Sequence, residues 1–253
     1  MYKICKIIFS TNRLEYLEKT LKAQSNLDFT GCSVHGLFFD DYPTNRDNKY
    51  ITELVNKYGY SEVILHEENK GLSLTWNECW DLVKSRDYDY IWHQEDDVVI
   101  LQPVKVLELV DLLKKSEKIS QVVLGRQKWY STDGDIMGIK ETDCFFNNYR
   151  YNLTQNAFSP MASLYSTSIL KIDFKKFLDI NYNEGFLGVY LDLIFNKSSA
   201  IIKNMDGSNI IEHIGEWFTG KRVLPGEPNY SAFSMYDPNK KYYSRNGQEY
   251  NET

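Results

Sequence analysis

Three consecutive carboxylates stand directly behind an apolar and aromatic run in the stretch DYIWHQEDDVVILQP, residues 89–103. Glu95 and Asp97 are one residue apart, so in an extended segment their side chains share one side of the chain while that of Asp96 points away. Mg²⁺ and Mn²⁺ prefer oxygen ligands such as these, and accept water and phosphate oxygens in their remaining positions. The spacing therefore indicates a site for a divalent cation, and the alternative is a solvated acidic turn.

Strands and helices that alternate over the first hundred residues would place these acids at one edge of a sheet. Apolar runs at 3–10, 34–43, 61–67 and 87–94 predict strands, and apolar residues at helical spacing between the runs predict helices. Such βαβ units form a largely parallel sheet, whose ligands bind beyond the carboxyl ends of the strands. The polar residues that follow the runs should therefore converge: Thr11, Asn12, Arg13, Asp40, Asp41, Glu67, Glu68, Asn69, Glu95, Asp96 and Asp97.

The second half of the chain has a less regular pattern. Residues 104–113 predict a helix and residues 121–125 a strand, whereas the polar and aromatic stretch 126–160 has no clear periodicity. We interpret that stretch as loops over the edge that carries the acids. Further along, the pattern predicts a short apolar run at 161–166, helices near 168–178 and 185–195, and strands near 199–203 and 209–213, before a Tyr- and Asn-rich tail.

Length and composition are typical of a soluble globular protein. The 253 residues are 42% hydrophobic and 25% charged, and no linker divides them, so we expect one folded unit. A net charge of −6 argues against non-specific binding to nucleic acid or anionic lipid. We expect no membrane span and no signal peptide. The four cysteines form no C-x-x-C pair, and we expect reduced thiols in a cytoplasmic protein.

The chain resembles the nucleotide-sugar glycosyltransferases of the GT-A fold, whose metal motif, D-x-D or a variant, ends the fourth strand. FSTNRLEYLEKTLKAQ is similar to their first strand, nucleotide-contacting loop and helix, and FFDD to a second strand that ends in an acid near the base or ribose. ENKGLSLTWNECWDLV resembles their N-x-G helix. EDDVVILQP is similar to the acidic run of family-2-like and N-acetylglucosaminyltransferase-like enzymes. The resemblance covers residues 3–103 well and residues 155–220 more weakly.

The resemblance implies an α/β fold with a single domain, in which helices flank a mixed, mostly parallel central sheet. Residues 1–103 would form the nucleotide-sugar-binding half with the metal motif. Residues 104–225 would form the acceptor-binding and catalytic half, and residues 226–253 a C-terminal tail.

The resemblance also implies a site for Mn²⁺ or Mg²⁺, in which Asp97 binds the metal and Glu95 or Asp96 lies near the ribose. Other residues implied at the donor are Thr11, Asn12, Arg13, Asp40, Asp41, Asn69 and Gly71.

Two candidates lie in the second half. SNIIEHIGEW is similar to the family's late segment in which a His can complete the metal or diphosphate site, which makes His213 a candidate ligand. A His after an apolar run is also common as a structural residue. Lys221 and Arg222 could neutralise a leaving diphosphate, and the alternative is a solvated pair.

An inverting transferase needs a carboxylate that deprotonates the acceptor hydroxyl. The family places this base in an E-D-x-D-L type segment at the start of a helix. The corresponding stretch here, NEGFLGVYLDLIFNK, keeps Asp192 and Leu193 but has Val189 and Tyr190 in place of the Glu-Asp pair. Asp192 matches the pattern best and Glu184 is the rival, while a capping or solvated role for Asp192 is the alternative.

These features predict a metal-dependent glycosyltransferase that moves a sugar from a nucleotide-sugar, by resemblance a UDP-sugar, to an acceptor hydroxyl with inversion. A metal-dependent phosphoesterase or nuclease would account for Glu95, Asp97 and His213, but not for the order of strands and helices. A catalytically inactive GT-A protein that binds carbohydrate would account for the missing Glu-Asp pair. The fold does not choose the acceptor, for which a glycan, a lipid-linked sugar, a protein or a modified nucleobase is compatible.

Overall fold

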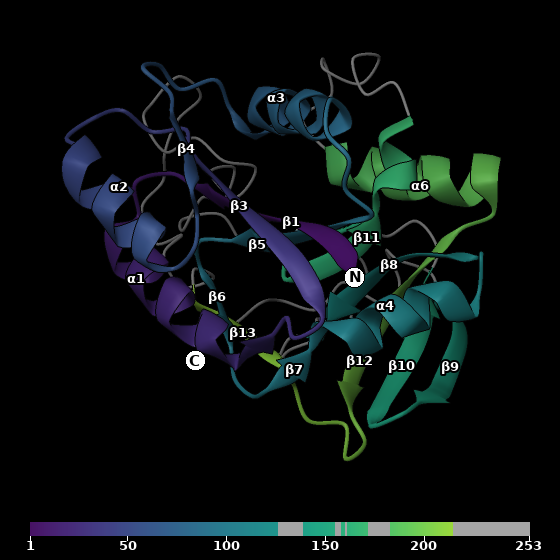
Figure 1. Cartoon of the computed structure of the whole chain (residues 1–253). Helices are drawn as coiled ribbons and strands as arrows, with labels where there is room; N and C mark the ends of the chain where they lie inside the picture. Colours follow the sequence, from purple (N-terminus) through teal and green to yellow (C-terminus); the bar gives the residue numbers. More distant parts are fainter. Residues whose placement is uncertain (126–138, 155–157, 160, 172–182, 215–253) are drawn as a thin grey trace, which may run out of the picture.

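The computed structural model describes residues 1–125, 139–154, 158–159, 161–171 and 183–214 (Figure 1). Within these residues one large sheet has the strand order β4-β3-β1-β5-β11-β8-β12-β10-β9. The first four strands of that order are parallel to one another. Strand β11 runs antiparallel between β5 and β8, β12 is parallel to β8, and β10 and β9 close the edge as an antiparallel pair. The sheet is therefore mixed and mostly parallel, as predicted.

The first half follows the predicted alternation of strands and helices. Its elements are β1 (Tyr2–Ser10), α1 (Leu14–Ala23), η1 (Gln24–Asn26), β2 (Leu27–Asp28), β3 (Cys32–Asp40), α2 (Asn48–Lys57), β4 (Glu62–Leu65), α3 (Leu72–Lys84), β5 (Tyr90–Glu95), β6 (Val98–Ile100) and β7 (Val104–Lys105). The parallel register is continuous, because all nine residues of β1 pair with β3 and six of them also pair with β5.

The second half completes the sheet. Its elements are α4 (Val106–Lys115), β8 (Ile119–Leu124), β9 (Ile139–Phe146), β10 (Tyr149–Thr154), β11 (Ser163–Ser166), η2 (Thr167–Lys171), α6 (Asn183–Phe195), β12 (Ser198–Asn204) and β13 (Ile211–His213). Of the helix predicted near 168–178, the described part is the short helix η2, and the remainder lies outside the described residues.

The interpretation of residues 126–160 as loops is wrong for much of the part that the structure describes. Strands β9 and β10 form a hairpin there, and β10 pairs with β12 at the edge of the large sheet. Asn147 has a φ of 48° in the turn between them, and Asn is one of the few residues that adopt this conformation readily. Two adjacent Asn residues between aromatic runs are therefore the signal for a hairpin that strict periodicity does not reveal.

Helices cover both faces of the parallel half (Figure 1). Alternate residues of a strand point to opposite faces, so the apolar runs of the sequence bury one set of side chains under each layer. Ile8 and Phe38 pack with α1 and α2 in one cluster. Ile7 and Phe39 pack with α3 and α6 in another, through Trp76, Trp80, Leu187 and Leu191. A third cluster lies under α4. Each fully buried side chain of this size contributes about 1.5–3 kcal/mol.

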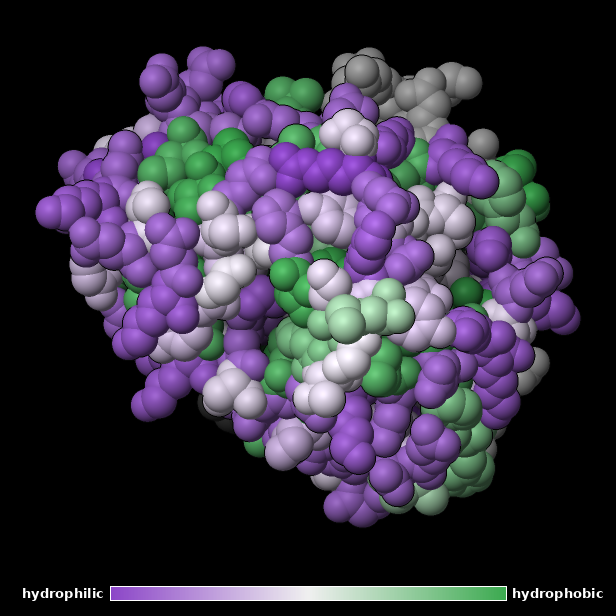
Figure 2. All heavy atoms as spheres, viewed as in Figure 1, coloured by the Kyte–Doolittle hydropathy of each residue, from purple (hydrophilic) through white to green (hydrophobic). Residues whose placement is uncertain are grey.

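The surface in the same view is mostly polar, with apolar residues gathered near its centre and at the end of α6 (Figure 2). The exposed apolar residues at the end of α6 are Leu193, Ile194 and Phe195. Among the described helices none has both the length and the apolar character that a membrane crossing requires.

Candidate active site

The acidic turn lies where the chain leaves the parallel sheet. Strand β5 ends at Glu95, Asp96 and Asp97 form a turn, and β6 then leaves the sheet to pair with β13. This pairing sets His213 opposite Val98, and Ile214 N–H donates to the carbonyl of Asp97 at 2.9 Å. A short antiparallel pair therefore brings His213 beside the acids.

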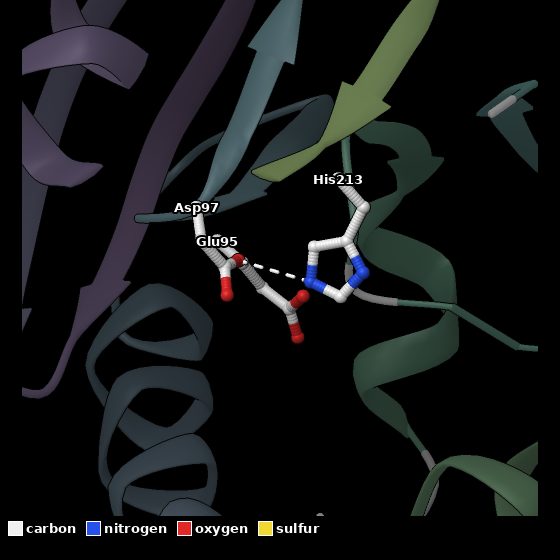
Figure 3. Close-up of side chains that lie close together, drawn as sticks. All are labelled: Glu95, Asp97 and His213. Atoms are coloured by element: carbon white, nitrogen blue, oxygen red, sulfur yellow. Dashed lines mark ion pairs between the residues drawn. The ribbon is translucent and has the colours of Figure 1, made fainter. Parts of the chain in front are cut away.

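The side chains of Glu95, Asp97 and His213 point toward one another (Figure 3). Their potential ligand atoms all lie within 4.8 Å of one another, and His213 Nε2 is 3.3 Å from Asp97 Oδ1. The side chains of Asp97 and His213 are only 5% and 7% exposed. The structure thus brings together the three residues that the sequence suggests as ligands or neighbours of a metal.

The residues present fit a divalent cation. Asp97 Oδ1 is buried and has no hydrogen-bond partner of good geometry among the described residues. A buried acceptor without a hydrogen bond costs stability, and a bound cation would remove that cost. Two carboxylates and one imidazole form a donor set that Mn²⁺ accepts readily, and Mg²⁺ would depend mainly on the two carboxylates.

Burial and mutual repulsion control the charges of the cluster. Burial, together with the negative charge of Asp97, raises the pKa of Glu95 to about 7. Burial opposes the ionisation of Asp97 too, but His213 and Arg13 outweigh it and hold the pKa of Asp97 below its ordinary value. At neutral pH Asp97 is therefore ionised, whereas Glu95 is only partly ionised.

Arg13 lies at the start of α1 and joins two of the acids. Its Nη1 donates to Asp97 Oδ2 at 2.6 Å, and its Nη2 donates to Asp96 Oδ1. Asp96 also accepts from Thr11 N–H at 3.3 Å, and Thr20 Oγ1 donates to the carbonyl of Asp96 at 2.8 Å. Asp96 thus faces away from the cluster, as its place in the sequence predicts. Thr11 and Arg13, suggested as donor contacts, fasten the loop after β1 to the acidic turn.

Asp40 is fully buried at the end of β3, and protein groups occupy its carboxylate. It accepts from the N–H of Asn12 at 2.8 Å, from the N–H of Tyr42 at 3.1 Å and from Arg46 Nη1 at 2.9 Å. Asp40 therefore holds the loop that contains Asn12. The sequence does not predict the ion pair between Arg46 and Asp40, because this pair forms only when the loop after β3 folds back.

Asp41 holds the second loop of the edge. Its carboxylate accepts from the N–H groups of Lys70 and Gly71 at 2.9 and 2.6 Å, and its Oδ1 lies 2.8 Å from His66 Nδ1. His66 Nε2 is 3.2 Å from Glu78 on α3, which also pairs with Lys70 at 2.7 Å. Sequence reasoning missed His66 and Glu78, although His66 lies near the end of the third predicted strand, 61–67, and directly follows β4 in the structure.

Asn69 is an exposed residue of this loop, and its Oδ1 accepts from the N–H of Gly71 at 3.0 Å. Gly71 precedes α3 with a φ of 79°, a conformation that residues with a side chain rarely adopt. Both residues therefore lie at the carboxyl edge of the sheet, where the sequence suggests donor binding.

The two candidate bases lie at opposite ends of α6. Strand β12 starts at Ser198 beside Ile119, at the start of β8, and β8 runs in the same direction as β5. The end of α6 therefore lies at the edge of the sheet opposite the acidic turn (Figure 1). Asp192 is in the last turn of α6, and the structure does not bring it to the cluster. Glu184 is in the first turn, about 12 Å away along the helix axis.

Three of the sequence-based suggestions fall outside the part of the chain that the structure describes: Lys221, Arg222 and the tail at 226–253. The side chain of Glu184 is also outside it.

Comparisons with known proteins agree with this geometry. The sequence matches the family model described as Glycosyl transferase family 2 over residues 5–173. A search of curated protein sequences finds no match.

Several solved structures are similar to the chain in fold. S. aureus TarS superposes with a TM-score of 0.53 at 16% identity, over 86% of this chain and 38% of TarS. A structure of GalNAc-T7 with UDP, GalNAc and Mn²⁺ gives 0.55 at 11% identity, over 84% and 44%. The mannosyltransferase PcManGT from Pyrobaculum calidifontis, in complex with GDP-Man and Mn²⁺, gives 0.51 at 8% identity, over 73% and 50%. This chain therefore spans half or less of each of these chains, and at such identities the likeness shows the fold alone.

The raised pKa of Glu95 predicts that Mn²⁺ binding releases protons. Below the pKa of about 7 a proton occupies Glu95, and a cation must displace it, so Mn²⁺ affinity should rise with pH and level off above that pKa. Calorimetry near pH 7 in two buffers with different heats of ionisation counts the released protons. The variant Glu95→Gln should release fewer protons than the wild type. Equal proton release by the two proteins would contradict the assignment.

Proposed function

We propose that this chain, which belongs to glycosyl transferase family 2 and is a glycosyltransferase, moves a sugar from a nucleotide-sugar to an acceptor hydroxyl with the aid of a divalent cation. The observation that carries the proposal is the buried cluster of Glu95, Asp97 and His213 at the carboxyl edge of the parallel sheet. Parallel sheets bind their ligands at this edge. We assign Asp97 and His213 as metal ligands and Glu95 as their partner.

Each residue of the cluster makes a different contribution to binding the cation. A cation held here by Asp97 and His213 would supply positive charge beside the diphosphate, where negative charge develops when the bond between sugar and nucleotide breaks. Asp97 directs Oδ1 toward this position while Arg13 occupies Oδ2 at 2.6 Å. Glu95 becomes a full anion when it loses its proton. His213 enters from β13, so the cluster depends on the pairing of β13 with β6.

The donor in this proposal is a UDP-sugar that lies along the loops of the same edge. The structure of GalNAc-T7 contains UDP, as does a structure of S. aureus TarS 1–349, whereas the mannosyltransferase contains GDP-Man. Thr11–Arg13 and Asn69–Gly71 border the edge and would contact the donor, and Asp40 and Asp41 serve the donor by holding these two loops. Lys221 and Arg222 keep their proposed role at the diphosphate.

The direction of α6 favours Glu184 as the base. Only its first turn points toward the carboxyl edge of the sheet, where the sugar would be held. A carboxylate at this end of the helix can approach an acceptor hydroxyl from the face opposite the leaving nucleotide, which gives inversion. Asp192, in the last turn, lies too far along the axis to reach the same hydroxyl.

The proposed function is tested with a panel of nucleotide-sugars. We expect wild-type protein with Mn²⁺ to release nucleoside diphosphate slowly from one of them and to leave polynucleotides uncut. Asp97→Asn should abolish the release, because the amide cannot supply a charged ligand, whereas Asp111→Asn on the exposed face of α4 should not change it. Cleavage of a polynucleotide would favour a nuclease. A folded protein that binds sugar without any release would favour an inactive carbohydrate-binding protein.

The assignment of the base predicts a contrast between two isosteric variants. Glu184→Gln should lower turnover by roughly 100-fold to 10,000-fold with little change in donor affinity, because a general base acts in the transition state. Asp192→Asn is the matched control on the same helix and should keep wild-type turnover. Steady-state rates and donor dissociation constants give both quantities. A collapse of turnover in Asp192→Asn alone would reverse the assignment.

A further inference from the structure

A chain of buried polar side chains lies behind the acidic turn, on the face of the sheet opposite α3. Lys6 and Gln24 are each 8% exposed, and Gln94 is fully buried. Gln94 directly precedes the three acids. Its side chain points toward η1, whereas the preceding side chain, His93, contacts Trp76 of α3 on the other face. Strand β5 therefore separates this series of polar side chains from the proposed metal position.

The hydrogen bonds of this chain all run in one direction. Lys6 Nζ donates to Gln24 Oε1 at 3.4 Å, Gln24 Nε2 donates to Gln94 Oε1 at 3.1 Å, and Gln94 Nε2 donates to the carbonyl of Val98 at 2.8 Å. Lys6 is also bonded to the carbonyl of Tyr58 at 2.8 Å. Donors that point the same way polarise one another, so each bond strengthens the next. This series of hydrogen bonds begins at the charged ammonium of Lys6 and ends at the carbonyl of Val98, at the end of the acidic turn.

The last bond of the chain closes the turn across the acids. Gln94 and Val98 flank Glu95, Asp96 and Asp97, so the bond between them fixes the two ends of the turn. The carbonyls in between are held as well, that of Asp96 by Thr20 and that of Asp97 by the N–H of Ile214. The directions of the Glu95 and Asp97 side chains follow from this backbone.

Apolar side chains of similar size would fill the same space at a lower cost in stability. A buried polar group is costly unless it is hydrogen-bonded, and a buried ammonium is more so. Burial lowers the pKa of Lys6 to about 8, which expresses that cost. What the polar chain supplies, and an apolar core would not, is a directed bond to the carbonyl of Val98.

We propose that Gln94, held by Gln24 and Lys6, is a positioning residue that keeps Glu95 and Asp97 directed at one cation. The inference rests on the proposed function, in which these two acids hold the metal. Outer-shell partners of this kind commonly change metal affinity by about 10-fold to 100-fold when they are removed.

The test compares Gln94→Met with a matched control, Gln121→Met. Gln121 is equally buried on β8, two strands away in the sheet, and its amide donates to the carbonyl of Ser159 at 2.6 Å and to Ser163 Oγ at 2.9 Å. Both variants lose a buried hydrogen-bonded amide. We expect Gln94→Met to bind Mn²⁺ alone about 10-fold more weakly in calorimetry and to broaden the spin resonance spectrum of the bound ion. Gln121→Met should bind Mn²⁺ like the wild type.

Each outcome has a distinct meaning. Unchanged Mn²⁺ affinity in Gln94→Met, or equal weakening in both variants, would overturn the positioning role while the metal site stands. Absence of Mn²⁺ binding in the wild type would overturn the metal site of the proposed function and this inference with it. If Gln94→Met does not fold, Gln24→Met replaces it. This variant leaves the bond to Val98 and the bond from Trp92 Nε1 to Gln94 Oε1 at 3.3 Å, but it removes the bond from Gln24. It should show a smaller loss of affinity, and no loss would overturn the inference.

Discussion

Repulsion among three carboxylates that are adjacent in sequence and shielded from water is the constraint on which this site depends. Charges interact more strongly in a protein interior than in water, so Glu95, Asp96 and Asp97 would disrupt the turn without compensation. Arg13 supplies one positive charge, shared between Asp96 and Asp97, and His213 supplies at most one more. Once Glu95 has lost its proton, above its pKa of about 7, three charged acids therefore face at most two positive partners. The remaining negative charge is what a divalent cation would balance.

The aspartates at this edge of the sheet have different roles because their tertiary contacts differ. Backbone N–H groups and cationic side chains bind the carboxylates of Asp40, Asp41 and Asp96, which fix loops. Asp97 keeps one buried oxygen, Oδ1, that forms no hydrogen bond of good geometry among the described residues and lies 3.3 Å from His213 Nε2 on the side of Glu95. The structural acids thus form a rigid support for the acid that is left open. A strand end and two fastened loops give that support its precision.

The sequence predicts the parts of this structure that depend on local pattern. The alternation of strands and helices, the parallel sheet and the gathering of acids at one edge follow from apolar periodicity and chain direction. The hairpin of β9 and β10 was beyond that pattern, because its main signal is the pair Asn147 and Asn148. The pattern does not predict the ion pairs of Arg13 either. Periodicity shows which face of a segment is buried, but not which residue 83 or 84 positions away that segment contacts. Nor does a motif give the direction of α6, which separates Glu184 from Asp192.

Metal binding by Glu95, Asp97 and His213 is tested most directly by a crystal structure of the protein with Mn²⁺ and UDP, with anomalous scattering measured at the manganese absorption edge. We expect an anomalous peak bounded by Glu95, Asp97 and His213, with Asp97 Oδ1 among the ligands and Arg13 still bonded to Oδ2. Bound UDP without a peak at this position, or a peak elsewhere on the edge with these three side chains unchanged, would contradict it.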